Sequence, residues 1–241
     1  MMFQATALAL GTGFVFANDG TFFLISNWHN FSGKNPATGA HLAATGAEPD
    51  RLLIWWNAKN QLGAKFSAEA MLRDKEGRPL WLVHPVHGRQ IDVAALPIIP
   101  HSGAEPYPIN QMPSANLAVK IGSDAFILGY PYGIGPSGLP IWKRGSIASE
   151  PLLAGATDQR FILVDTASRP GMSGSPVIAR TRGASAMEDG STAIMGEATR
   201  LIGVYSGRLV TNDPLDVQLG MVWPINLVSE IIAGSTRDLA V

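Results

Sequence analysis

Three short segments carry side chains that could act together in nucleophilic catalysis. His29 follows an apolar run, Asp92 opens another, and Ser173 lies in the glycine-rich segment 169–176. A serine hydroxyl is a weak nucleophile that needs an adjacent base, usually histidine, which a buried acid orients. Glycines on both sides of a serine allow a tight turn, in which the N–H groups of Gly171 and Ser173 could point at a developing oxyanion. These residue types therefore favour acyl transfer.

The order of the three residues narrows the choice of triad. In α/β-hydrolases the order is Ser, acid, His, but no histidine follows Ser173 here. The nucleophile-elbow pattern Gly-x-Ser-x-Gly also fails, because Ser175 occupies its last position. The subtilisin order places the acid first, and only Asp19, in a predicted hairpin turn, precedes His29. The remaining order, His29, Asp92, Ser173, is that of chymotrypsin.

The composition predicts a well-buried chain with many turns. Of 241 residues, 46% are hydrophobic and only 15% charged, with 26 glycines and 17 prolines. This combination argues against intrinsic disorder, coiled coils and long charged helices. The formal net charge of −1 removes the main electrostatic driver of nucleic-acid binding. No apolar run reaches the ~18 residues of a membrane span, and the absence of cysteine excludes disulfides, thiolate metal sites and a cysteine nucleophile.

The elements that must position these side chains are mostly predicted strands. Asp-Gly at 19–20 between apolar runs indicates a hairpin. The expected strands are 8–16, 21–26, 52–57, 65–73, 80–84, 91–98, 125–129, 141–148, 161–166, 175–180 and 201–204. Segment 181–199 is expected to be a surface loop or a ragged hairpin. A final helix over 227–232 is expected to be capped by Asn226 and stopped by Gly234.

This pattern predicts an all-β chain with two antiparallel units. They cover residues 1–105 and 116–241, and the proline-rich segment 99–116 is expected to link them. The apolar N-terminal segment 1–16 lacks a basic region and a clear cleavage site, so it makes a poor signal peptide and is interpreted as the first strand. The cellular compartment and the oligomeric state stay open.

Several motifs, in the right order, resemble the trypsin-like (chymotrypsin-fold) serine peptidases, most closely the bacterial and HtrA-type members. The segments that carry the resemblance are 23–29, 92–94, 129–131, 145–147, 165–176, 201–207 and 220–225. The resemblance implies two six-stranded β-barrels, a short C-terminal helix and an active site in the cleft between the barrels. It also implies a serine endopeptidase that acts on proteins or peptides without a cofactor.

The resemblance assigns a role to each candidate catalytic residue. His29 would take the proton of Ser173 and later give it to the leaving amine. Asp92 would hold the histidine tautomer and stabilise the imidazolium. The backbone N–H groups of Gly171 and Ser173 would form the oxyanion hole.

The same resemblance places a specificity pocket near segment 201–207. Tyr205, Ser206 and Gly207 would line it, although Ser206 could also be an ordinary strand serine. Ala167, six residues before the nucleophile, would lie near its floor. Because Ala167 is uncharged, we expect small or apolar P1 residues rather than basic ones.

The sequence departs from the family pattern at two positions beside the nucleophile. Met172 stands where many animal members have aspartate and many HtrA-type members have asparagine. A methionine cannot pair with a newly cut N-terminus, so we expect no activation step of that kind. Ser175 replaces a common glycine. No domain follows residue 241 in this sequence, so an HtrA-type PDZ module is not expected.

Other readings remain open for these residues. Ser173 could be a plain turn serine, His29 a core residue paired with Trp28, and Asp92 the first residue of a strand. The chain could then be a catalytically silent binding or scaffolding module, or the same machinery could hydrolyse esters. Asp165 is interpreted as structural. The histidines of segment 84–87 lack a matching ligand set, so no metal is expected.

Overall fold

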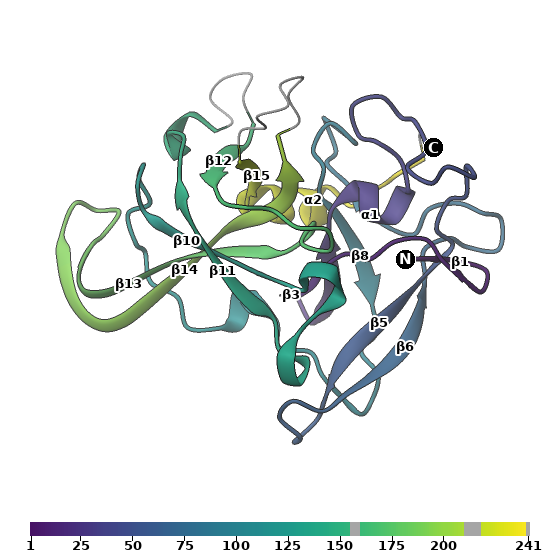
Figure 1. The fold of residues 1–241 in the computed structure, drawn as a ribbon, viewed down its shortest axis with the longest axis horizontal. Helices are drawn as coiled ribbons and strands as arrows, with labels where there is room; N and C mark the ends of the chain where they lie inside the picture. The colour runs from purple at the N-terminus through teal and green to yellow at the C-terminus, as the bar shows by residue number, and fades with distance from the viewer. Residues whose placement is uncertain (155–159, 210–217, 240–241) are drawn as a thin grey trace.

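A computed structural model of the chain describes residues 1–154, 160–209 and 218–239. Figure 1 shows two β-rich units side by side, with helix α2 (Asn226–Gly234) between them. Strands dominate both units, and the all-β class predicted from the sequence is confirmed. The described residues contain no helix that is long and apolar enough to cross a membrane.

The second unit is a closed antiparallel barrel with strand order β10-β11-β12-β15-β14-β13. Its strands are β10 (Asp124–Gly129), β11 (Ile141–Ile147), β12 (Ile162–Asp165), β13 (Pro176–Ala186), β14 (Thr192–Arg208) and β15 (Leu219–Pro224). Its interior is filled mainly by branched aliphatic side chains, such as Ile127, Val164 and Val222. Such residues suit the pleated, inward-facing positions of a barrel.

The first unit differs from the closed six-stranded barrel that was expected. Within the described ranges it forms two five-stranded sheets. One contains β3 (Phe14–Asn18), β4 (Thr21–Ser26), β7 (Leu82–Val83), β8 (Ala94–Ile98) and β16 (Thr236–Arg237). The other contains β1 (Met2–Phe3), β2 (Thr6–Ala7), β5 (Arg51–Ala58), β6 (Lys65–Met71) and β9 (Ala104–Glu105).

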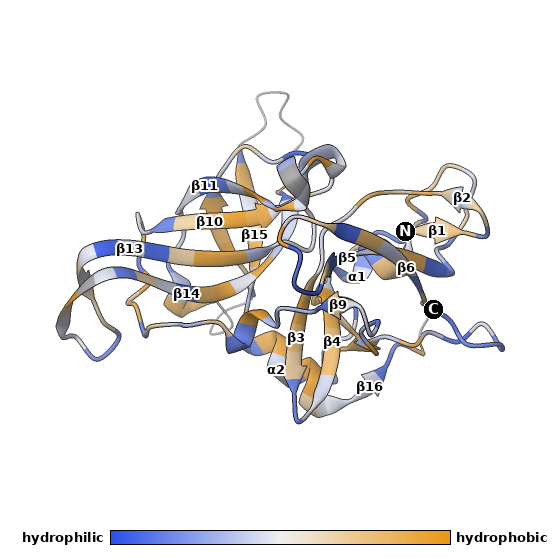
Figure 2. Cartoon of the chain, turned by 90° about the horizontal axis from the view of Figure 1, so that it is seen from below, coloured by the Kyte–Doolittle hydropathy of each residue, from blue (hydrophilic) through white to orange (hydrophobic). Residues whose placement is uncertain are grey.

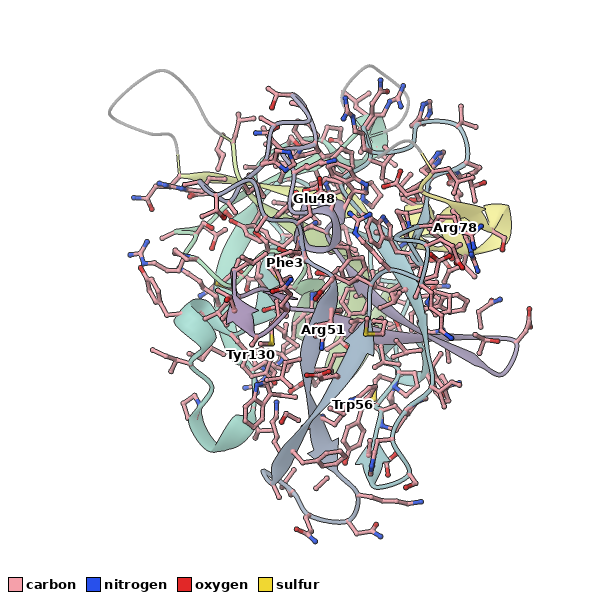
Figure 3. The ribbon with its side chains drawn as sticks, turned by 90° about the vertical axis from the view of Figure 1, so that its right-hand side faces the viewer. Phe3, Glu48, Arg51, Trp56, Arg78 and Tyr130 are labelled. Carbon is pink, nitrogen blue, oxygen red and sulfur yellow. The ribbon has the colours of Figure 1, made fainter. Side chains whose placement is uncertain are left out.

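The reason for this difference lies in which edges the strands pair with. The long β5–β6 hairpin bonds to the short strands β1 and β9. The edge beside β7 is taken by β16 from the far end of the chain. Figure 3 labels Arg51 and Trp56 on β5 of this hairpin. Trp56 is buried and Trp55 is 62% exposed, which agrees with the interpretation of this pair as core and edge packing.

The predicted hairpin at Asp19-Gly20 is confirmed. Both residues have positive φ, 46° and 76°, as a tight two-residue turn between strands requires. The flanking strands pair from Asn18↔Thr21 to Phe14↔Ile25. This hairpin fixes the strand that leads to His29.

Of the two expectations for segment 181–199, the irregular hairpin is confirmed and the loop is wrong. Strands β13 and β14 pair from Pro176↔Val204 to Ala186↔Thr192, with register shifts at 177/178 and at 181/183. Its tip projects away from the barrel in Figure 1. The polar, small residues that suggested a loop are compatible with a strand pair that has solvent on both sides.

The helices are short. Helix α1 (Trp28–Ser32), which was not predicted, follows β4. The described residues also form four 3-10 turns: η1 (Ile109–Gln111), η2 (Pro131–Gly133), η3 (Pro136–Gly138) and η4 (Pro151–Leu153). In α2 the expected cap is wrong. Ile225 occupies the N-cap position, and the Asn226 side chain instead donates to Glu230 Oε1 at 2.8 Å. Gly234 is the last residue of the helix, and Ser235, with φ of 48°, takes the left-handed C-cap position that was expected at Gly234.

One hydrophobic cluster joins the two halves of the chain. Figure 2 shows the hydrophobic strands β3 and β4 beside α2. The first half contributes Phe14, Phe16, Phe23, Ile25, Leu82, Ile91, Val93 and Ala95, and the second contributes Val204, Trp223, Val228, Ile231 and Ile232. The division into units 1–105 and 116–241 stays a prediction, and segment 99–116 carries β9 and η1.

The C-terminal tail is tied to the first unit by a buried carboxylate. Asp238 is 4% exposed, and its Oδ2 accepts from the indole N–H of Trp28 at 2.6 Å and of Trp81 at 3.1 Å. Both tryptophans are fully buried. The tail thereby holds the helix that carries His29.

We expect Asp238→Ala to lower the free energy of unfolding by roughly 2–5 kcal/mol, because two buried indole donors lose their acceptor. Urea unfolding, read from the midpoint at unchanged slope, measures the effect. The matched control is Arg237→Ala, which removes an exposed side chain next to it. Equal midpoints for the two variants would contradict this role.

Candidate active site

His29 is the second residue of α1, directly after β4. The helix is a single turn that ends at Gly33, whose φ of 71° suits glycine. Its neighbours Trp28 and Phe31 are buried in the first unit, whereas the His29 side chain stays 18% exposed. The local sequence therefore anchors the helix on both sides of His29 and leaves the ring at the surface.

Asp92 is buried and lies against His29. Its Oδ2 is 2.7 Å from Nδ1 of the ring, and its Oδ1 accepts the backbone N–H of His29 at 3.0 Å. Its own backbone carbonyl accepts from Asn27 Nδ2 at 2.7 Å. Since a carboxylate can only accept, Nδ1 carries the proton and Nε2 is left as the basic nitrogen. The geometry thus selects the tautomer that a general base requires.

Ser206 completes this cluster in a way that the sequence did not indicate. It lies on β14 of the second unit, and its hydroxyl donates a short hydrogen bond to Asp92 Oδ2. The sequence suggested a pocket-lining or ordinary strand serine at this position. A strand serine gives no signal of a partner more than a hundred residues away, so only the fold reveals this contact.

Ser173 lies in a turn that backbone hydrogen bonds hold in place. Its carbonyl accepts from Thr12 N–H at 2.9 Å and from Asn30 Nδ2 at 3.2 Å, and Asn30 directly follows His29. The next N–H, of Gly174, donates to Tyr205 O at 2.8 Å. Within the described part of the chain, no hydrogen bond joins the His29 ring to the Ser173 hydroxyl. Such bonds are often long before substrate binds.

The glycines of this turn allow its close approach to neighbouring backbone. Gly171 has φ of 92°, and a Cβ there would lie 2.5 Å from Tyr130 O. Gly174 has φ of 87°, and a Cβ there would lie 2.1 Å from Thr12 O. Both values are shorter than any normal contact. The turn can therefore exist only with glycine at both positions.

Two N–H groups of the turn are left without a partner. Among the residues that the structure describes, neither Gly171 N–H nor Ser173 N–H has a hydrogen-bond acceptor. The carbonyl before each one is held: Pro170 O accepts from Tyr132 N–H at 2.7 Å, and Met172 O accepts from Ser175 N–H at 3.1 Å. Because C=O and N–H point in opposite directions across a trans peptide, both free N–H groups point away from these donors.

The four residues expected to line a specificity pocket are not equivalent. Gly207 lies beside the serine, since a Cβ added to it would be 3.6 Å from Ser173 Oγ. Ala167 is half-buried. The Tyr205 side chain is 1% exposed and packs in the core of the second barrel, where burial raises the pKa of its hydroxyl. Its backbone is engaged as well, since its N–H donates to Ser175 O and its carbonyl accepts from Gly174 N–H, both at 2.8 Å.

A cleft of about 660 Å³ opens beside His29, Asp92 and Ser206. Its other lining residues are Asn35, Pro36, Ala37, Leu42, Arg89, Gln90, Arg208, Met221 and Trp223. The lining loop after α1 is anchored by Glu48, labelled in Figure 3. Glu48 contacts Lys34 Nζ at 2.9 Å and Arg73 Nη2 at 2.6 Å. The residues that line the cleft come from both halves of the chain, between 29 and 92 and between 206 and 223.

The histidines of segment 84–87 lie elsewhere, next to α2. The ring of His84 is 3.0 Å from Glu230 Oε2 and stacks on His87. This contact lowers the pKa of Glu230. Across the described ranges, no group of three or more acidic, histidine or cysteine side chains could hold a metal ion.

Comparisons with known proteins give one family match. Residues 11–184 match the trypsin-like peptidase domain. A search of curated proteins finds no significant match. The structure is similar to the HtrA-type protease AlgW with a tripeptide, with 16–18% identity and TM-scores of 0.47–0.49. These matches cover 93% of this chain and 55% of the AlgW chain, so this chain spans about half the length of AlgW.

A second similar structure is an inactive form of Rv3671c from M. tuberculosis. The identity is 18%, the TM-score is 0.46, and the match covers 95% of this chain and 84% of that one. The family assignment rests on the domain match, which covers most of the chain. This chain belongs to the trypsin-like peptidase domain family.

Proposed function

We propose that this chain is a serine endopeptidase that cleaves peptide bonds through an acyl-enzyme, with His29, Asp92 and Ser173 as the catalytic triad. The observation that carries the proposal is the buried Asp92 carboxylate, which accepts from both the His29 ring and Ser206. Burying a carboxylate costs free energy unless hydrogen-bond donors compensate its charge. Here its position fixes the histidine tautomer beside a cleft.

In the acylation step, Ser173 Oγ attacks the scissile carbonyl carbon and its proton passes to His29 Nε2. The carbonyl π electrons move to the oxygen, which becomes an oxyanion held by the N–H groups of Gly171 and Ser173. Asp92 stabilises the imidazolium that forms. When the C–N bond breaks, His29 gives its proton to the leaving amine and an acyl-Ser173 ester remains.

In the deacylation step, water takes the place of the amine. His29 removes a proton from the water as its oxygen attacks the acyl carbon. The second tetrahedral intermediate collapses, the C–O bond to Ser173 breaks, and Oγ recovers a proton from His29. The product carboxylic acid leaves and the enzyme returns to its starting state.

Substrates of this proposed activity are proteins or peptides, and the reaction needs no cofactor. Ala167 brings no charge to the floor of the proposed pocket, and Gly207 leaves room beside Ser173. These features support small or apolar P1 residues. The competing functions are a silent binding or scaffolding module and ester hydrolysis by the same groups.

We expect a fluorophosphonate probe to label the folded protein at Ser173, and Ser173→Ala to abolish labelling and lower kcat for peptide hydrolysis by about 10⁶. Mass spectrometry of the labelled peptide identifies the site. The control is Ser102→Ala, which changes an exposed serine.

Folded wild-type protein that is not labelled would support the silent module instead. A protein that is labelled but cleaves only esters would support the ester hydrolase.

Asp92→Asn is expected to lower kcat by about 10⁴, because the amide no longer selects the required tautomer. Proton NMR provides an independent check. The Nδ1–H proton of His29, bonded to a buried carboxylate, should resonate far downfield of the amide protons, and Asp92→Asn should remove that signal. The control Asp165→Asn changes an exposed carboxylate and should keep it. A wild-type spectrum without the signal would contradict the contact.

A peptide library is expected to show cleavage after small or apolar P1 residues, and Ala167→Asp to shift the preference toward lysine and arginine. The added carboxylate would pair with a basic side chain in the pocket. Profiling of P1 for both proteins measures the shift. If Ala167→Asp stays active with an unchanged profile, residue 167 does not lie at the pocket floor.

A further inference from the structure

We propose that Thr12 is a positioning residue for the oxyanion hole: its hydroxyl connects the turn at Tyr130 to Gly171 and holds the Gly171 N–H in its working direction. The inference rests on the proposed function, because it concerns the turn that carries the proposed nucleophile. Thr12 lies just before β3 and is 4% exposed. Neither the sequence motifs nor the triad assignment uses it.

Every hydrogen-bonding group of Thr12 is engaged with another part of the fold. Its hydroxyl donates to Gly171 O at 2.7 Å and accepts from Tyr130 N–H at 3.1 Å. Its backbone N–H donates to Ser173 O at 2.9 Å, and its carbonyl accepts from the Ser26 hydroxyl at 2.8 Å. Two of these four bonds end on the turn that carries the proposed nucleophile.

The bonds fix the two peptide planes on either side of the Gly171 α-carbon. The plane before it is held through Pro170 O, which accepts from Tyr132 N–H at 2.7 Å. The plane after it is held through Gly171 O, which accepts from Thr12, and through Met172 N–H, which donates to Arg169 O at 3.3 Å. A glycine can rotate about both of its bonds at little steric cost. Gly171 N–H lies in the first plane, so the Thr12 hydroxyl acts on its direction through the Gly171 α-carbon and through the turn at Tyr130.

The same hydroxyl also stabilises the segment that holds the first plane. Tyr130 N–H ends on Thr12 Oγ1, and two residues later Tyr132 has φ of 53°, a left-handed value that is unusual for a tyrosine. Figure 3 labels Tyr130, whose hydroxyl accepts from Lys65 Nζ at 2.7 Å. Thr12 Oγ1 therefore bonds both to Gly171 and to the turn at Tyr130, the two segments that position the Gly171 N–H.

The side chain of the residue before the proposed nucleophile cannot hold these peptide planes by hydrogen bonds. Met172 has an apolar side chain that is 1% exposed and packs in the core of the second barrel. It offers no charge and no strong hydrogen-bonding group to the turn. Within the segment the backbone of Met172 bonds to Ser175 and Arg169, and Thr12 adds its hydroxyl and its N–H from outside the segment.

The test compares Thr12→Val, which keeps the branched shape and removes the hydroxyl, with Thr12→Ser, which keeps the hydroxyl. Removing one oxyanion donor typically costs about 10²–10³ in rate. We expect a partly misdirected donor in Thr12→Val to lower kcat by about 10–100-fold. KM should change less than about threefold, and fluorophosphonate labelling should slow in parallel with kcat. Thr12→Ser should stay within about threefold of wild-type kcat.

The matched control is Thr181→Val on the β13–β14 hairpin, where the lost hydroxyl shares a hydrogen bond with Ser185 Oγ at 2.6 Å. It should leave kcat and labelling unchanged. Urea midpoints of all variants ensure that rates are compared on folded protein. A merely structural threonine would lower the midpoint of Thr12→Val without lowering kcat.

The outcomes separate this inference from the proposed function. Folded Thr12→Val with wild-type kcat and labelling overturns the role of Thr12 alone. If Thr12→Val does not fold, Thr12→Ala replaces it: kcat about 10–100-fold lower on folded protein, with Thr12→Ser near wild type, supports the role, and wild-type kcat in Thr12→Ala overturns it. Wild-type protein that is neither labelled nor active overturns the proposed function and this role with it.

Discussion

The site depends on the close approach of three backbone segments: the turn at 171–174, the chain at Thr12 and the turn that begins at Tyr130. At Gly171 and Gly174 the neighbouring carbonyl oxygens lie where a Cβ would be, so no side chain can fit between them. The candidate nucleophile is consequently located by backbone hydrogen bonds from both halves of the chain. Among the residues that the structure describes, its hydroxyl makes no hydrogen bond that holds the turn, which leaves it available for the proposed chemistry.

The buried charge of Asp92 imposes a second requirement on the same region. A carboxylate out of water must be compensated by donors, and here they come from the His29 ring, the His29 N–H and the Ser206 hydroxyl. Two of the donors belong to α1 and the third to β14 of the other unit. The contact that orients the histidine therefore also joins the units, next to the hydrophobic cluster that they share.

Features set by neighbouring residues could be predicted from the sequence. The turn at Asp19-Gly20 and most strand positions are of this kind. Features set by distant partners could not be predicted. Ser206 gives no local signal of its bond to Asp92, and Asn226 is a good cap that bonds to Glu230 instead. The first unit divides into two sheets because strands far apart in the chain occupy its edges.

The absence of cysteine now has a structural counterpart. Without disulfides, the two halves are joined by apolar packing around α2 and by buried polar contacts such as that of Asp238 with Trp28 and Trp81. Packing alone cannot fix the turn at 171–174, since at Gly171 and Gly174 the neighbouring segments approach through their backbones and leave no space for a side chain. At such distances only hydrogen bonds between main-chain groups and small polar side chains can supply the attraction. That is why a threonine, a serine and glycines surround the candidate nucleophile in a protein whose interior is otherwise largely apolar.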